Sequence, residues 1–180
     1  MILGLDISTA ITGITVIDRN GEIITCEAWK FQNKKQYPNL HAKAAEVKEH
    51  FLKMKLMYPI EAIYIEQSLW AFRSGQSSAK TIMTLAKFNG IISWIAYETF
   101  GIHPEYIGAS QARKMCGVPK KEKGEDIKKV VLKFLLDTEE EFCYDETKFG
   151  NPVPGTYDRA DSLIIARAGA LCLKNQQKRK

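Results

Sequence analysis

Short runs of apolar and β-branched residues at the start of the chain predict a β-meander. The first run ends at Asp6-Ile7-Ser8-Thr9, and a second run rich in Ile, Thr and Val follows. Asn20-Gly21, a strong hairpin signal, separates the second run from a third, alternating one. We therefore expect three strands joined by tight loops, at residues 2–7, 12–18 and 22–31.

The rest of the chain alternates between helix and strand patterns. Apolar residues spaced by three or four predict helices, and short apolar runs between turn residues predict buried strands. The expected helices are 40–57, 78–100, 110–115, 125–136 and 157–173, and the expected strands are 62–66 and 103–107. The helix at 78–100 is apolar nearly all round, which indicates that a second surface covers it in addition to the sheet, such as a partner subunit.

A meander followed by alternating strands and helices is typical of an α/β fold with a mixed sheet. We expect five strands flanked by helices, with three strands antiparallel and two parallel. A chain of 180 residues is long enough for one core. We expect a single domain over 1–173, which includes an irregular connection at 138–156, and a flexible basic tail at 174–180.

Composition narrows the class of protein. The chain is 45% hydrophobic and 26% charged, as is usual for a globular domain. The sequence lacks a long apolar window and a secretion-signal pattern, so we expect no membrane association and a cytoplasmic location. The 26 basic against 21 acidic residues, a net charge of +5, favour an anionic partner. The cysteines and histidines form no zinc-binding pattern.

Four carboxylates stand where a metal site would be built. Asp6 and Glu66 each end an apolar strand. If these strands are parallel neighbours, their carboxyl ends lie side by side, where open α/β sheets usually place their sites. Asp158 and Asp161 are spaced i, i+3 at the start of the last helix, so both point in one direction.

Such a group of acids implies a particular chemistry. Like charges a few ångströms apart raise one another's pKa, and divalent cations relieve the repulsion. Oxygen ligands favour Mg²⁺ or Mn²⁺, and a pair of ions activates a water molecule, holds a phosphate and stabilises the leaving oxygen. The predicted reaction is phosphodiester hydrolysis with two ions per active site and no nucleotide cofactor.

Each acid also has a purely structural interpretation. Asp158 and Asp161 would stabilise a helix N-terminus through its dipole. Asp6 would close an Asx-type turn onto the loop backbone at Ser8 and Thr9. Glu66 is harder to explain in this way, because it adjoins a buried strand. The joint pattern of the four is more specific than any one of them.

These motifs resemble those of a known family. Gly4-Leu5-Asp6-Ile7-Ser8, Thr12-Gly13, Ile65-Glu66-Gln67 and Asp158-Arg159-Ala160-Asp161-Ser162-Leu163 are similar, in order and spacing, to the acidic motifs of RuvC-type Holliday-junction resolvases. The resemblance implies a ribonuclease H-like fold and a homodimer built on the helix at 78–100. It also implies two-metal cutting of four-way junctions and other branched DNA into 5′-phosphate and 3′-hydroxyl ends. Asp6, Glu66, Asp158 and Asp161 would then be the catalytic metal ligands.

Basic and aromatic residues near these motifs are candidate DNA contacts. The resemblance implies a lysine before the final motif that supports charge in the transition state, and among several candidates we favour Lys123. The predicted DNA-binding residues are Trp70, Phe72, Arg73, Arg113, Lys114, Lys120, Lys121 and Lys123. A solvated charged loop accounts for the lysines equally well, and core packing accounts equally well for Trp70.

Three other functions fit parts of the pattern. A related nuclease of the same fold would cut forks, flaps or RNA–DNA hybrids with identical metal chemistry. An ATP-using sugar kinase or actin-like protein also opens with glycine, aspartate and hydroxyl residues at a strand turn, but it needs two lobes and a second phosphate loop. A non-catalytic DNA-binding protein would have no need of the four acids.

Overall fold

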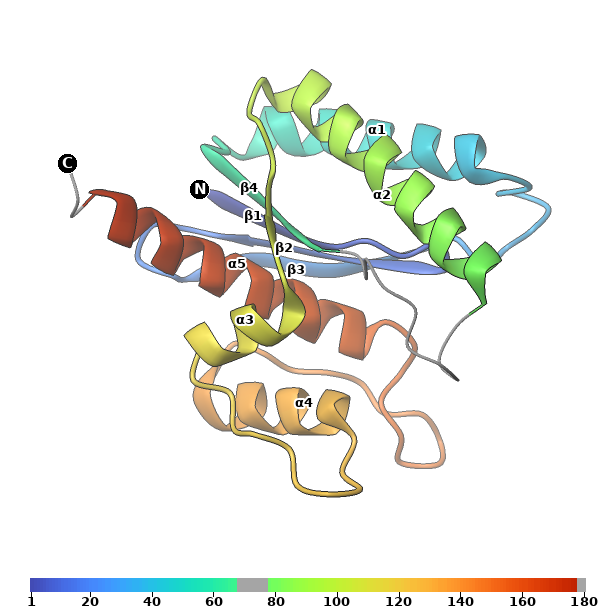
Figure 1. The fold of residues 1–180 in the computed structure, drawn as a ribbon. Helices are drawn as coiled ribbons and strands as arrows, with labels where there is room; N and C mark the ends of the chain where they lie inside the picture. The colour runs from blue at the N-terminus through green and yellow to red at the C-terminus, as the bar shows by residue number, and fades with distance from the viewer. Residues whose placement is uncertain (68–77, 178–180) are drawn as a thin grey trace.

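A computed structural model of the chain describes residues 1–67 and 78–177 (Figure 1). One five-stranded sheet has the order β3-β2-β1-β4-β5. Its strands are β1 (Ile2–Asp6), β2 (Ile11–Ile17), β3 (Ile23–Lys30), β4 (Ala62–Glu66) and β5 (Glu105–Ile107). The first three are antiparallel neighbours, whereas β4 runs parallel to β1 and β5 parallel to β4. The predicted mixed sheet is confirmed.

Helices cover both faces of this sheet (Figure 1). One face carries α1 (Leu40–Met57) and α2 (Ala79–Phe100). The other carries α5 (Thr156–Gln177), with α3 (Ala109–Met115) and α4 (Ile127–Thr138) packed beyond and beside it. The core is therefore divided into two apolar layers by the sheet.

Strand alternation sets which side chains enter which layer. Successive residues of a strand point to opposite faces. In β1, Leu3 and Leu5 are buried against the α1 and α2 side, whereas Ile2 is buried on the α5 side. In β4, Ile63 and Ile65 share the first layer, and Tyr64 shares the second.

The long helix α5 lies unusually close to the sheet, because glycines stand beneath it. A Cβ atom on Gly4 would come within 2.6 Å of the backbone of Ser162 and Ala166. A Cβ atom on Gly13 would come within 1.9 Å of the Asp158 carbonyl oxygen. A buried hydroxyl pair, Thr15 and Ser162 at 2.8 Å, also joins the sheet to α5. These contacts fix the start of α5 above the carboxyl end of β1.

The predicted boundaries hold with few exceptions. α2 has the expected caps, since the Ser78 side chain accepts from the Thr81 amide and Gly101 adopts the left-handed conformation. α4 begins two residues later than predicted, because the Asp126 side chain caps it. α5 continues to Gln177, so residues 174–177 of the predicted flexible tail are helical. In the described part, no helix is long and apolar enough to cross a membrane.

Candidate active site

Strand register brings Asp6 and Glu66 together at one edge of the sheet. Leu5 and Ile65 are partners in the parallel pair β1–β4, so the next residue of each strand is an acid. Asp6 and Glu66 stand two residues beyond Gly4 and Tyr64, which face α5. Both carboxylates therefore belong to the α5 side of the sheet by alternation.

The first turns of α5 supply the other two acids. Asp158 and Asp161 line the same pocket as Asp6 and Glu66, a hollow of about 340 Å³. The remaining lining residues come from the β1–β2 loop, from the residue after β4, from α2 and from α4: Ile7, Ser8, Gln67, Ile82, Leu85, Asn89 and Lys128. The buried Asn89 side chain donates to the Glu66 carbonyl oxygen at 3.4 Å, which ties α2 to the end of β4. The predicted meeting of the four acids is thus found.

Burial and mutual repulsion raise the pKa values of these acids. The pKa of Asp6 lies well above its ordinary value because the group is buried and faces Glu66, Asp161 and Asp158. Burial and the charge of Asp161 raise the pKa of Glu66 to about 7. Burial also raises the pKa of Asp161 to about 6, against the opposing effect of Lys128 and Arg113, and it raises the pKa of Asp158. The pocket therefore favours cations.

The structural interpretation of Asp6 is wrong. The turn after β1 is closed by Ser8, whose hydroxyl accepts from the Ala10 and Ile11 amides and donates to the Ile11 carbonyl oxygen. Thr12 completes the turn by donating to the Ser8 carbonyl oxygen at 3.0 Å. Asp158 lies in the first turn of α5, so the predicted stabilisation of the helix N-terminus through its dipole applies to this acid.

The donor set suits a hard divalent cation. The acids are four carboxylates, and the amide of Gln67 and the hydroxyl of Ser8 line the same hollow, so oxygen donors dominate it. Within residues 1–67 and 78–177, however, no three His, Cys, Asp or Glu side chains already enclose a metal position. The carboxylates thus share a pocket without forming a closed coordination shell.

The basic residue of the pocket is Lys128, which sequence reasoning missed. Lys128 lies in the first turn of α4, lines the pocket and opposes the pKa rise of all four acids. Lys123, the predicted choice, lies in the exposed turn before α4 and is not among the lining residues. The helical phase of α4 turns Lys128 toward the acids, and its spacing of three, four and seven residues from the buried Val131, Leu132 and Leu135 is the sequence signal that could have indicated this.

The other predicted DNA contacts have separate outcomes. Arg113 on α3 is half-buried and lies close enough to lower the pKa values of Glu66 and Asp161. Lys114, Lys120 and Lys121 are exposed and lie outside the pocket lining. The predicted contacts Trp70, Phe72 and Arg73 lie outside the described residues.

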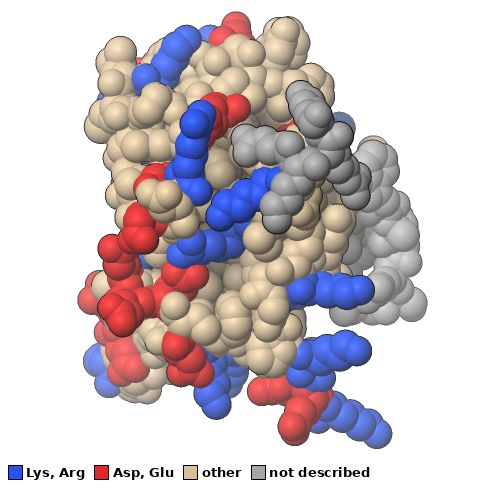
Figure 2. Space-filling model, turned by 90° about the vertical axis from the view of Figure 1, so that its left-hand side faces the viewer, with Lys and Arg blue, Asp and Glu red and all other residues tan. Residues whose placement is uncertain are grey.

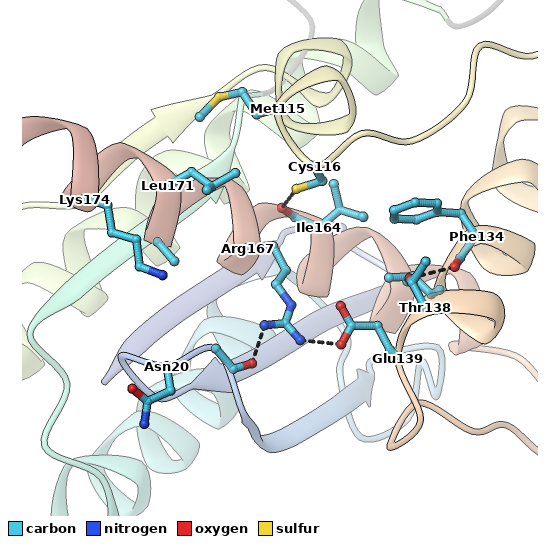
Figure 3. A pocket seen from close by; sticks show the side chains of 13 residues that line it. Asn20, Met115, Cys116, Phe134, Thr138, Glu139, Ile164, Arg167, Leu171 and Lys174 are labelled. Atoms are coloured by element: carbon cyan, nitrogen blue, oxygen red, sulfur yellow. Dashed lines mark hydrogen bonds and ion pairs between the residues drawn. The ribbon is translucent and has the colours of Figure 1, made fainter.

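The end of the molecule opposite the carboxylate pocket carries a mixed charge. Figure 2 shows this end, where basic and acidic side chains are intermixed and the acidic ones gather along one edge. A second hollow here, of about 330 Å³, lies between α4 and α5. Arg167 crosses it to pair with Glu139 and to donate to the Gly21 carbonyl oxygen (Figure 3). Arg167 thereby anchors the β2–β3 turn and the end of α4 to α5.

The raised pKa values predict that the metal-free protein loses stability as pH rises. Glu66 and Asp161 hold protons more tightly when folded, so their contribution is complete below about pH 4 and is lost as pH rises through about 6 to 7. We expect the free energy of unfolding in urea with EDTA to fall by several kcal/mol over this range. Glu66→Gln should flatten the dependence, and an unchanged slope in that variant would contradict the assignment.

Comparisons with known proteins define the class of fold. No protein-family model and no curated sequence matches this chain. Solved structures do match, and the mixed sheet flanked by helices is the ribonuclease H-like fold, as predicted.

Three solved structures share this fold with the chain. RuvC of Thermus thermophilus in complex with a Holliday junction substrate has a TM-score of 0.65 at 17% identity, covering 97% of this chain and 94% of that one. A structure of Thermus thermophilus RuvC has a TM-score of 0.60 at 16% identity, covering 97% and 96%. The yeast mitochondrial Holliday junction resolvase Ydc2 has a TM-score of 0.62 at 16% identity, covering 99% and 80%.

Proposed function

We propose that this protein is a structure-selective endonuclease that resolves Holliday junctions or other branched DNA by metal-dependent phosphodiester hydrolysis. The main support for this proposal is that one pocket is lined by four carboxylates, those of Asp6, Glu66, Asp158 and Asp161. The fold shared with RuvC bound to a Holliday junction substrate supports the choice of DNA substrate. Cutting would leave 5′-phosphate and 3′-hydroxyl ends.

The pocket residues have distinct roles in this proposal. Asp6, Glu66, Asp158 and Asp161 would hold two Mg²⁺ or Mn²⁺ ions. These ions supply water activation and stabilisation of the leaving oxygen. Neighbouring carboxylates with raised pKa values release their protons as cations bind, so cation binding should strengthen as pH rises. Lys128 and Arg113 place positive charge where a scissile phosphate would lie.

The test compares labelled DNA substrates of equal length. Four-way junction, fork, flap, linear duplex and RNA–DNA hybrid are mixed with the purified protein, with Mg²⁺, Mn²⁺ or EDTA. Paired nicks in the junction alone support a resolvase, and cutting mainly of forks, flaps or hybrids supports a related nuclease. Cutting that persists in EDTA, or an absence of cutting on every substrate, contradicts the proposal.

Lys128→Ala is expected to slow junction cutting by about 10- to 100-fold, with a smaller loss of affinity. The reason is that Lys128 faces the carboxylates, where transition-state charge develops. Lys129→Ala, next to it on an exposed position of α4, is the matched control. Lys123→Ala tests the sequence-based choice. Single-turnover rates of junction cutting measure the effect of each variant. Equal rates for Lys128→Ala and Lys129→Ala would show that Lys128 has no role in the mechanism.

We also propose that the active form is a homodimer built on the outer face of α2. Three large hydrophobic side chains of α2 are exposed to solvent: Met83 at 59%, Trp94 at 62% and Tyr97 at 45%. Trp94 and Tyr97, together with Tyr106 of β5, line a shallow hollow between α2 and β5. A second copy bringing the same face would cover this patch and pair two active sites with the two-fold symmetry of a four-way junction.

Trp94→Glu is expected to convert the dimer to a monomer, because it places a charge at the centre of the apolar patch. Leu56→Glu is the control, since Leu56 is 88% exposed on α1 and does not line this hollow. Sedimentation velocity of the wild type and both variants measures the state. A monomeric wild type, or a dimeric Trp94→Glu, would contradict this assignment of the interface.

A further inference from the structure

Phe149 is a large apolar side chain that the fold leaves in solvent. It is 78% exposed, although it lies in an ordered connection between α4 and α5. The same connection buries Phe142, which is only 3% exposed, so an apolar side chain in this segment is not exposed by default. The exposed ring of Phe149 is therefore available to a partner outside the chain.

The segment around Phe149 is held in a defined shape. A short hairpin is closed by the Val153 amide donating to the Asp145 carbonyl oxygen at 3.0 Å, and by the bridge between Glu146 and Pro152. The Thr147 amide donates to the Asn151 carbonyl oxygen at 2.7 Å, so Lys148, Phe149 and Gly150 form the tip. Gly150 has a φ of 73°, which a tight turn requires. Phe149 is thus presented on a structured tip.

Both ends of this connection are attached to α5. Glu139 at its start pairs with Arg167. The guanidinium of Arg159, which directly follows Asp158, lies 5.3 Å from the Phe142 ring centroid. At the other end, the Thr156 amide donates to the Val153 carbonyl oxygen at 3.2 Å, so the base of the hairpin leads directly into the first turn of α5.

The hairpin tip lies at the active-site end of the molecule. In Figure 1 the orange loop before α5 projects beside the starts of α4 and α5, which carry Lys128 and Asp158. Three paired positions separate the tip from the base of the hairpin, a reach of about 10 Å. The length of the hairpin thus equals the rise of about three stacked bases along one DNA strand.

The chemistry of the tip fits a nucleic acid base. Within the tip, residues 147–151, Lys148 is the sole charged residue, and its Nζ atom lies 5.0 Å from the Phe149 ring centroid. A cation beside an exposed ring combines phosphate attraction with a stacking surface, as single-strand binding sites do. The acidic residues of the connection precede the tip, and two of them, Asp145 and Glu146, belong to the base of the hairpin, so phosphate attraction at the tip rests on Lys148.

We infer that Phe149 is a base-stacking residue, which takes an unpaired base of branched DNA bound across the carboxylate pocket. This inference rests on the proposed function. It gives the connection at 138–156 a role in selecting branched over linear DNA, because fully paired duplex offers no free base face.

The experiment measures binding in EDTA, where cutting does not interfere, to a four-way junction and to a linear duplex of equal length. Phe149→Ala is expected to weaken junction binding by about 5- to 100-fold and duplex binding by less than about twofold. Phe149→Trp should restore junction affinity and increase the quenching of tryptophan emission on junction binding above that of the wild type, which has three tryptophans of its own. Leu56→Ala, an exposed apolar residue of α1, is the matched control.

The outcomes separate the inference from the function. If the wild type cuts junctions and Phe149→Ala binds them as tightly as the wild type does, Phe149 is not a base-stacking residue and the proposed endonuclease function stands. If the wild type neither binds nor cuts branched DNA, both fail. Equal losses on junction and duplex would also overturn the inference, since they would indicate a general contact rather than base stacking. Unchanged thermal unfolding of Phe149→Ala verifies that the fold is intact.

Discussion

Replacing Asp6 with asparagine is expected to abolish junction cutting while junction binding is kept. Cutting should fall by at least about 100-fold, because a carboxylate at the centre of the pocket loses its charge. Affinity should change by less than about threefold, since binding rests mainly on Lys and Arg contacts with phosphates. Gel-shift titration and single-turnover cutting with Mg²⁺ measure the two effects separately.

The same variant should be more stable than the wild type without metal. Burial and the neighbouring Glu66, Asp161 and Asp158 all raise the pKa of Asp6, so asparagine removes a buried repulsion at neutral pH. Thermal unfolding in EDTA should move upward, and the further rise on adding Mg²⁺ should shrink. Asp137→Asn, the same change at an exposed position of α4, is the control. Cutting by Asp6→Asn at the wild-type rate would exclude Asp6 from the site.

Replacing Gly13 with alanine is expected to impair both folding and cutting. The added methyl group would stand 1.9 Å from the Asp158 carbonyl oxygen, so the start of α5 must move away from the sheet. We expect a loss of about 1–3 kcal/mol or more, a fall in Tm of roughly 3–10 °C. Cutting should drop further than stability alone explains, because Gly13 is the register partner of Asp6 and the shift separates Asp158 from it.

A matched glycine supplies the control. A Cβ atom on Gly90 in α2 meets nothing within 4 Å of its own chain, so Gly90→Ala should raise stability by helix propensity. Because Gly90 lines the hollow proposed as the dimer interface, sedimentation velocity verifies that this variant keeps the oligomeric state of the wild type. Thermal unfolding of both variants, with cutting measured well below either Tm, separates misfolding from misplacement of Asp158. A fully active and stable Gly13→Ala would show that α5 adjusts freely above the sheet.

Local patterns were sufficient to predict the sheet and the acids. An apolar strand that ends in a carboxylate is visible within a few residues, as at Asp6 and Glu66. The i, i+3 spacing of Asp158 and Asp161 is equally local. The parallel pairing of β1 with β4 brings Asp6 and Glu66 together. This pairing follows from the crossover between the two strands, which the order of elements already implied.

The basic residue and the connection before α5 were beyond the reach of local patterns. Which lysine faces the pocket depends on how α4 packs against α5, because the spacing within α4 places Lys128 on the buried side but does not show what that side faces. The connection at 138–156 has no periodicity, and its shape depends on distant contacts such as Glu139 with Arg167. These contacts come from packing, which a linear pattern does not encode.

The place of α5 in the chain has a consequence for when the carboxylate pocket is completed. Two of the four acids arrive on the last helix, while Asp6 and Glu66 belong to strands made much earlier during synthesis. A nascent polypeptide that stops short of Thr156 has half of the pocket and leaves the glycine-lined side of its sheet uncovered. Completion of the pocket and of the core therefore coincide, and under the proposed function a partly synthesised chain would lack two of the four metal ligands and would not cut DNA.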